Sequence, residues 1–374
     1  MAERVLKSPL RRFANAFVLA LNLIVAVGMF VTAYAGTVSP IEHPLMGVIV
    51  LSFPVWLAAM VLLLVADLIW WRRTSLIAVA GIAAAWPMVW NICPMNVGAD
   101  TPAVISTDRL FTLLTYNVMN FTDQNGAYAH DINPTISYIL EKDADIVCLQ
   151  EAPMLDRSDV IHLHQAQLDS VHARYPYVVL SGHSMAILSK FPVTNLHLAI
   201  SDLGPQSTGD MAAYTIDVEG RRLAVFSVHL QSYSLNANDK ESFVELTRLK
   251  PDEDNVRDLK NSMLQKLESA AVLRALQAQE LARYVDYYGG ENVIVCGDFN
   301  DVPGCYTLRT LEEHGLREVW PAVAFGPTVT FNADRFYFRI DHLLWRGCLR
   351  PVSISRGNVK CSDHYPLLTT FMWD

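Results

Sequence analysis

Two polar residues follow a short apolar run in the stretch VIVCGDFND, which covers residues 293–301. Residues 293–296 are typical of a buried strand, Gly297 ends the apolar pattern, and Asp298 and Asn300 come directly after it. Side chains two residues apart on an extended backbone point to the same side, so this carboxylate and this carboxamide are predicted to lie together. Such oxygen ligands suit a hard cation such as Mg²⁺, although a simple Asn/Asp turn has the same pattern.

Further apolar runs also end in a polar or charged residue. These residues are Asn117 after LFTLLTY, Glu151 after DIVCLQ, His229 in FSVHLQ, Asp341 in RIDHLLW, and Asp363 with His364 in SDHYP. Any one of them alone is ordinary, because turn caps, structural histidines and solvated strand-end carboxylates are common. The ends of strands are where α/β folds build their sites, so the repetition predicts that these side chains meet in one place.

The runs that would position these residues alternate between strand-like and helix-like patterns. Strands are predicted at 110–117, 145–151, 185–188, 212–218, 223–230, 293–300, 339–345 and 367–372, and helices at 132–142 and 254–288. The segment 233–290 is longer than one crossover between strands requires. Its polar part, 236–254, is predicted to be either a loop over the site that helps to select the substrate or a solvated surface excursion.

The first 95 residues differ in character from the rest of the 374-residue chain. Hydrophobic residues make up 52% of the chain, and the excess is concentrated in three runs at 13–36, 45–71 and 75–92. Each run is close to the roughly 20 residues that cross a bilayer, so three transmembrane helices are predicted. A cleaved signal peptide is the alternative for the first run, and buried core helices are the alternative for all three.

Basic residues set the predicted orientation of these helices. Arg4, Lys7, Arg11 and Arg12 precede the first run, Arg72 and Arg73 separate the second from the third, and the loop at 37–44 has neither Lys nor Arg. The positive-inside rule then puts the N-terminus in the cytoplasm and everything after residue 92 on the outer, periplasmic face of the cell (inner) membrane. If the third run does not cross the bilayer, the large domain is cytoplasmic instead.

Charge and cysteine content argue against a nonspecific DNA-binding protein, a disulfide-rich protein and a zinc protein. Residues 1–100 hold six basic and four acidic residues, so of the total formal charge of −9 the remaining residues carry −11. The large domain therefore lacks the basic excess of a tight, nonspecific DNA binder. Six scattered cysteines form neither a disulfide framework nor a zinc motif, and the sequence leaves open a disulfide among Cys305, Cys348 and Cys361.

The motifs TYN, LQE, SVHL, GDFN, IDH and SDHYP follow one another in this order along the chain. In this the chain resembles the endonuclease/exonuclease/phosphatase superfamily from residue 110 to residue 374. That family includes pancreatic-type deoxyribonucleases, abasic-site endonucleases, bacterial sphingomyelinases and inositol-polyphosphate 5-phosphatases. The resemblance implies a DNase I-like, four-layer α/β sandwich of two mixed sheets with helices outside. The expected domains are a membrane anchor at 1–95, a linker at 96–109 and a catalytic domain at 110–374.

The resemblance also implies a metal site. Glu151 would bind a divalent ion, Mg²⁺ or alternatively Mn²⁺, with Asn117 beside it and Asp363 as a further ligand or outer partner. A divalent ion on a phosphoester oxygen offsets the negative charge that repels a nucleophile, and it stabilises the leaving group.

The remaining strand-end residues match the catalytic positions of the family. Asp298 would orient or deprotonate the attacking water, and Asn300 would hold that water or a phosphate oxygen. His364 would stabilise the transition state, and Asp341 would orient it and keep it protonated, because a carboxylate partner raises the pKa of an imidazole. His229 would act beside the leaving group as a general acid.

The sequence therefore predicts a membrane-anchored, Mg²⁺-dependent phosphoesterase that acts outside the cytoplasm on a lipid headgroup, a small phosphoester or nucleic acid. The alternatives are a nuclease for extracytoplasmic DNA or RNA and a noncatalytic receptor for phosphorylated ligands. The complete set of Asp298, Asp341 and His364 argues against the receptor. A transporter is disfavoured because the three runs contain one charged residue, Asp67, which lies near an end.

Overall fold

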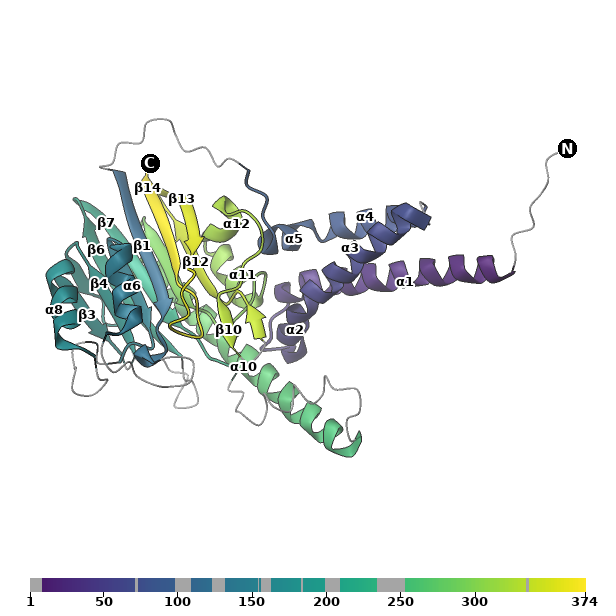
Figure 1. The fold of residues 1–374 in the computed structure, drawn as a ribbon, viewed down its shortest axis with the longest axis horizontal. Coiled ribbons are helices and arrows are strands. Elements are labelled where there is room, and N and C mark those ends of the chain that lie inside the picture. The colour runs from purple at the N-terminus through teal and green to yellow at the C-terminus, as the bar shows by residue number, and fades with distance from the viewer. Residues whose placement is uncertain are drawn as a thin grey trace.

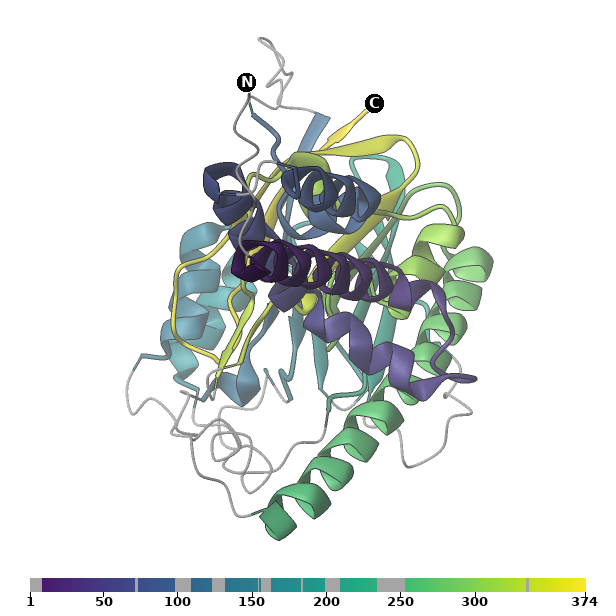
Figure 2. The ribbon, with the colours of Figure 1, turned by 90° about the vertical axis from the view of Figure 1, so that its right-hand side faces the viewer.

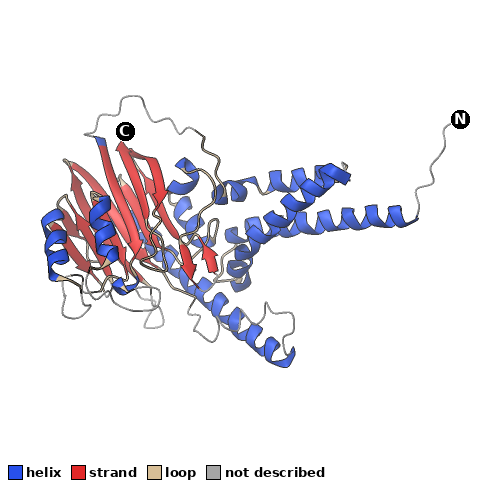
Figure 3. Cartoon of the chain, in the orientation of Figure 1, coloured by secondary structure: helices blue, strands red, loops and turns tan. Residues whose placement is uncertain are grey.

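The computed structural model describes residues 9–70, 73–97, 109–122, 132–153, 155, 163–182, 184–198, 209–233, 253–333 and 336–374. Two six-stranded β-sheets face each other, and helices cover both outer faces (Figures 1 and 3). This confirms the predicted four-layer α/β sandwich. The N-terminal helices project from one side of the sandwich as an arm (Figure 1).

The first sheet combines the last two strands of the chain with the strands of the first motifs. In spatial order its strands are β13 (Leu349–Arg356), β14 (Leu367–Trp373), β1 (Leu110–Asn117), β2 (Ile146–Gln150), β4 (Met185–Ser189) and β3 (Tyr177–Ser181). Strand β2 is buried along its whole length, which explains its apolar sequence. Helices α6 (Pro134–Lys142) and α8 (Gln165–Arg174) cover the outer face. Asn133 caps α6 by accepting the backbone N–H groups of Thr135 and Ile136.

The second sheet carries the strands of the other motifs. In spatial order its strands are β5 (Val193–Asn195), β6 (Asp210–Val218), β7 (Arg221–His229), β8 (Val293–Asp298), β12 (Asp341–Arg346) and β9 (Arg317–Glu318). Helices α10 (Glu253–Tyr288) and α11 (Tyr306–Glu313) pack their apolar faces against its outer side. The short α12 (Val319–Val323) contacts β12 and β13, and β10 (Phe331–Ala333) pairs with β11 (Phe336–Phe338) in a small separate hairpin.

The inner faces of the two sheets form one apolar core, in which Phe111 of β1 stacks on Phe371 of β14. The predicted strands and the two predicted helices are all present, with ends that differ by two residues or fewer. Most of the predicted polar loop at 236–254 lies outside the described residues. All six cysteines lie in the described residues and are free, so no disulfide joins Cys305, Cys348 and Cys361.

The arm consists of helices that run back and forth beside one another (Figures 1 and 2). They are α1 (Pro9–Tyr34), η1 (Ala35–Thr37), α2 (Pro44–Ile49), η2 (Val50–Ser52), α3 (Phe53–Trp70), α4 (Ser75–Ala84) and α5 (Trp86–Ile92). Helix α1 runs from the far tip towards the sandwich, α3 returns to the tip, and α4 with α5 leads back to the sandwich (Figure 1). Asp67, the one charged residue in the three predicted spans, is buried among these helices.

Two segments of the arm, Arg12–Thr37 and Pro44–Trp70, are long and apolar enough to cross a membrane. The third predicted span is not one straight helix, because α4 and α5 meet at a bend of 72°. Pro87 lies at the start of α5, where its missing backbone N–H prevents a continuous helix. The described residues therefore contain two candidate spans, or three if the bent pair crosses as one.

The arm packs on the α/β sandwich and shares an apolar core with it. Gly36 lies so close to the loop after β8 that a Cβ there would be 2.0 Å from the carbonyl oxygen of Gly304. The indole N–H of Trp90 donates to the carbonyl of Pro321 at 3.1 Å. Helix α2 also lies against α10 (Figure 2). Residues 98–108 of the predicted linker lie outside the described residues.

Candidate active site

The carboxyl ends of strands from both sheets meet at one edge of the sandwich. In the first sheet β1 and β2 run parallel, and Asn117 pairs with Gln150 where they end. In the second sheet β7 and β8 run parallel, and His229 pairs with Asp298. Strand β12 runs antiparallel to β8, so its first residue, Asp341, lies opposite Asp298. The fold thus brings these strand-end residues into one cluster.

Asp298 lies at the centre of this cluster and is almost fully buried. Its Oδ1 accepts the backbone N–H of Asn300 at 2.8 Å, and its Oδ2 accepts from Nδ2 of Asn117 at 3.1 Å. Gly297 precedes it with φ of 135°, and a Cβ at this position would lie 2.1 Å from the carbonyl oxygen of Val228. Only glycine permits this close approach of β7 and β8, so the glycine of the GDFN motif sets the position of Asp298.

His364 lies between two carboxylates that face each other across β8 and β12. Its Nδ1 is 2.8 Å from Oδ2 of Asp341, and its Nε2 is 3.5 Å from Oδ2 of Asp298. Burial alone would lower the pKa of His364, but Asp341 and Asp298 outweigh burial and raise this pKa to about 10. A positive imidazolium therefore separates two carboxylates that would otherwise repel each other.

Glu151 is the more exposed carboxylate of the cluster and follows β2 directly, with 30% of its side chain accessible. Its Oε1 accepts a hydrogen bond from Nδ2 of Asn117 at 3.0 Å, while Oδ1 of Asn117 accepts the backbone N–H of Met119. The amide nitrogen of Asn117 thus faces the carboxylates and its oxygen faces away. Glu151 has φ of 51°, a left-handed conformation that is unfavourable for a residue with a Cβ and that is often found at functional sites.

His229 lies at the end of β7, next to Asp298 on β8. Its Nε2 is 3.7 Å from both Oε1 of Glu151 and Oδ2 of Asp298, too far for a direct hydrogen bond. Its side chain is 17% accessible. The imidazole is therefore close to the reactive carboxylates and still able to reach a ligand.

The structure also places the two remaining predicted residues beside the cluster. Asn300, with φ of 50°, donates from Nδ2 to the carbonyl of Leu230 at 3.0 Å. Oδ1 of Asp363 lies 3.2 Å from Oγ of Ser362. Burial raises the pKa of Asp363, and the negative charges of Glu151 and Asp298 add to the increase, while His364 opposes it. Its carboxylate is thus close to the other acidic groups.

Sequence reasoning missed three residues that support the cluster. Thr330 accepts the backbone N–H of Asp341 at its Oγ1 at 3.0 Å, which fixes the start of β12. Ser362 donates to the carbonyl of Asn117 at 2.9 Å and ties the loop before β14 to the end of β1. The ring of Phe331 packs edge-on against the imidazole of His364 with centroids 5.1 Å apart. Ser362 lies inside the SDHYP motif, but no local pattern marks Thr330 or Phe331.

Asp301, which follows the GDFN motif, is a structural residue. Its Oδ2 accepts the hydroxyl of Thr307 at 2.8 Å and lies 3.3 Å from Nε of the buried Arg274 on α10. Its backbone carbonyl faces Nε2 of His342 at 2.9 Å. The side chain of Asp301 therefore fixes the loop after β8 instead of facing the cluster.

The donor set fits a divalent cation beside Glu151. Asp298 and Asp341 flank the imidazolium of His364, and Asn117 links Asp298 to Glu151, so the carboxylates leave excess negative charge for a cation to balance. Asp298, Asp341 and His364 also bring ligand-type atoms within 4.8 Å of one another. The Nδ1 of His364 is occupied by Asp341, so the imidazole could offer only its Nε2 to a cation.

Two family models match the chain. The endonuclease/exonuclease/phosphatase family model matches residues 114–364, which is more than half of the chain and includes the whole cluster. A model described as a domain of unknown function matches residues 15–92, which form the arm. No match was found among curated proteins.

Solved structures with a similar fold share little sequence with this chain. An endonuclease/exonuclease/phosphatase from Beutenbergia cavernae is 17% identical over 71% of this chain and 72% of that chain, with a TM-score of 0.46. A family protein from Bacteroides thetaiotaomicron is 14% identical over 71% of this chain and 98% of that chain, with a TM-score of 0.45. A humanized TDP2 from D. rerio is 16% identical over 70% of this chain and 98% of that chain, with a TM-score of 0.44. On the family match over residues 114–364, this chain belongs to the endonuclease/exonuclease/phosphatase family of phosphoester hydrolases.

Proposed function

We propose that this chain is a membrane-anchored, divalent-metal-dependent phosphoesterase whose catalytic domain faces away from the cytoplasm. The arrangement of His364 carries the proposal. Its Nδ1 is held by Asp341 at 2.8 Å, while its Nε2, 3.5 Å from Asp298, remains able to donate to a phosphoryl oxygen. A positive donor fixed beside a carboxylate is what hydrolysis of a phosphate ester requires.

The residues of the cluster divide the chemistry among them. Asp298 would accept the proton of the attacking water, because its two oxygens are held in place by Asn300 and Asn117. His364 would donate to a phosphoryl oxygen as negative charge develops there. His229 would protonate the leaving oxygen, since its Nε2 has no hydrogen-bond partner among the described residues within 3.5 Å.

Glu151 would hold the divalent ion, with Asp363 near it as a second ligand or an outer partner. When bound, the ion would polarise a phosphoester oxygen and offset the charge of the surrounding carboxylates. Asn117 was predicted to ligate the ion. We now assign it to orienting Glu151 and Asp298, since its amide nitrogen faces both carboxylates.

The arm supports membrane anchoring and the outward orientation. Two of its segments, or three with the bent pair, have the length and composition of membrane spans. The tip of the arm lies far from the catalytic domain (Figure 1). The start of α1, which carries Arg11 and Arg12, and the junction of α3 and α4, which carries Arg73, both lie at that tip. By the positive-inside rule the tip would be cytoplasmic and the catalytic domain extracytoplasmic.

Hydrolysis by the full-length protein in lipid nanodiscs tests the proposal. The substrates are bis-p-nitrophenyl phosphate, phospholipids, inositol phosphates, plasmid DNA and RNA, each with Mg²⁺ and with EDTA. We expect turnover that requires the metal and is lost in His364→Ala. His314→Ala is the matched control, because His314 pairs with Asp286 on the surface and should retain full activity.

Each outcome decides between the candidate functions. Turnover of DNA or RNA alone would identify a nuclease. A folded protein that binds the phosphoesters but hydrolyses none of them would contradict the proposal and favour a receptor. Turnover that survives EDTA would contradict the metal dependence while leaving the hydrolase in place.

A further inference from the structure

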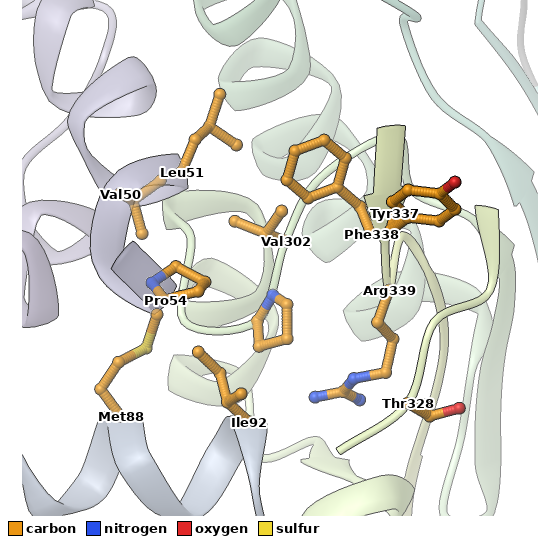
Figure 4. A pocket seen from close by; sticks show the side chains of 11 residues that line it. Val50, Leu51, Pro54, Met88, Ile92, Val302, Thr328, Tyr337, Phe338 and Arg339 are labelled. Carbon is orange, nitrogen blue, oxygen red and sulfur yellow. The ribbon is translucent and has the colours of Figure 1, made fainter. Parts of the chain in front are cut away.

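A pocket of about 160 Å³ lies where the arm meets the catalytic domain (Figure 4). We call it the seam pocket. Its arm side is entirely apolar and consists of Val50, Leu51, Pro54, Met88 and Ile92. These residues come from η2, α3 and α5, so the pocket lies where the helices of the arm are short or bent.

The opposite wall is built from segments that also carry the catalytic cluster. Val302 and Pro303 line the pocket just after Asn300. Arg339 lines it two residues before Asp341. Because consecutive Cα atoms are about 3.8 Å apart, the backbone of Arg339 lies within about 8 Å of the backbone of Asp341. Two separate chain segments therefore run from the wall of the pocket to the catalytic cluster.

The hairpin of β10 and β11 provides a third connection between the pocket and the cluster. Phe331 on β10 packs edge-on against His364. Tyr337 and Phe338 on β11 line the pocket, as does Thr328 just before the hairpin. The two strands of one hairpin thus contact the catalytic imidazole and the pocket.

The chemistry of the pocket favours an apolar ligand. Arg339 is the one charged residue among those that line it, and its guanidinium is already bonded to the carboxylate of Glu318 and to the carbonyl of Asn91. Val50, Leu51 and Pro54 belong to the candidate span Pro44–Trp70, so this wall continues directly into the apolar surface that would contact lipid.

We propose that the seam pocket holds part of a hydrocarbon chain of a membrane lipid whose phosphoester is hydrolysed at the Asp298–His364 cluster. This inference rests on the proposed function and names its substrate class. A chain that enters from the bilayer would bury methylene groups against the arm, while its phosphate reaches the cluster beside the β10–β11 hairpin. A soluble phosphoester has no such chain and gains nothing from the pocket.

A series of alkyl p-nitrophenyl phosphates, from ethyl to decyl, distinguishes chain binding in the pocket from the hydrolysis step. All members share the same reactive bond and differ only in the length of the alkyl chain. The full-length protein is assayed in nanodiscs. We expect kcat/KM to rise with chain length, by up to about fourfold for each methylene buried. Leu51→Trp and Ile92→Trp, which fill the pocket, should reduce kcat/KM for the decyl ester at least about tenfold and leave the ethyl ester unchanged. Val55→Trp is the control, because Val55 is 69% exposed on α3.

A direct readout does not depend on activity. A phospholipid with a diazirine on its acyl chain, added to the nanodiscs, should label pocket residues in the wild type and not in Leu51→Trp. Equal loss of both esters in the filled variants, or no preference for long chains, would overturn the inference while leaving the hydrolase intact. Labelling without any effect on the decyl ester would indicate a structural lipid and would also overturn it. If no ester is hydrolysed at all, the proposed function fails, and the inference fails with it.

Discussion

His364 and His342 are both buried, and both face a carboxylate through Nδ1. In His342 the Nδ1 is 2.6 Å from Oε1 of Glu318, and the Nε2 is 2.9 Å from the carbonyl oxygen of Asp301. In His364 the Nδ1 is 2.8 Å from Asp341, but the Nε2 is 3.5 Å from its nearest carboxylate. Both nitrogens of His342 are therefore engaged, whereas one nitrogen of His364 can still donate to a ligand.

The two histidines also differ in whether the charges around them are balanced. Arg339 neutralises Glu318, and although burial would raise the pKa of Glu318, Arg339 and His342 lower it below its ordinary value. Around His364 the carboxylates outnumber the cations, and no arginine among the described residues pairs with them. We call Glu318, Arg339 and His342 the balanced cluster, and the carboxylates around His364 with His364 itself the unbalanced cluster. A cluster with balanced charges stabilises the fold, whereas a cluster with excess negative charge can accept a metal ion and a substrate. Local charge balance thus distinguishes the structural histidine, His342, from His364, the histidine that we propose to be catalytic.

The largest expected effect concerns the unbalanced cluster. Asp298→Asn should reduce kcat/KM for bis-p-nitrophenyl phosphate by about 10²–10⁴-fold, because the amide can no longer accept the proton of the attacking water. Its thermal midpoint should shift by less than about 4 °C, since the amide oxygen can still accept the N–H of Asn300. Steady-state kinetics and a thermal melt of the same sample measure both. A large loss of stability would mean that Asp298 is a structural residue.

The balanced cluster should show the opposite pattern. Glu318→Gln leaves the buried Arg339 without its anionic partner and should lower the free energy of unfolding by about 3 kcal/mol. Activity per folded molecule should change little. Glu313→Gln is the matched control, because Glu313 is exposed on α11. A melt that coincides with that of the control would contradict the structural role of the balanced cluster.

The sequence predicts the unbalanced cluster better than the balanced one, because its residues lie at strand ends. Gly297 and the polar residues after it interrupt an apolar run, which is a local signal. Glu318, Arg339 and His342 carry no such signal, because only the folded sheet and the end of the arm bring them together. Their cluster is therefore invisible until the tertiary structure is known.

The secondary structure also has features that the sequence predicts and features that it does not. Edge strand β13 was not predicted, because Pro351 and the charged ends of the segment weaken its strand pattern, and an edge position tolerates them. The run 75–92 was predicted as one span from its apolar content. Pro87 was the signal that it bends, and the bend exists because α5 turns to pack on the catalytic domain.

The last expected effect is a pH dependence of stability that arises at His364. Without metal, the pKa of His364 in the folded protein is raised to about 10, against an ordinary value of 6.5. A raised pKa stabilises the folded state fully below pH 6.5, and this stabilisation is lost as the pH rises through about 10. Asp341→Asn removes the carboxylate that faces Nδ1 of His364 and should therefore remove most of this stabilisation.

The difference in thermal midpoint between the wild type and Asp341→Asn, measured in EDTA, should thus be largest near pH 6 and should shrink towards pH 10. The slope should not exceed about 1.4 kcal/mol per pH unit, the limit for one proton. Two melting curves that stay parallel from pH 6 to pH 10 would show that Asp341 does not control the protonation of His364. In that case the two histidines would differ in hydrogen bonding alone, and charge balance would no longer support the assignment of His364 as the catalytic one.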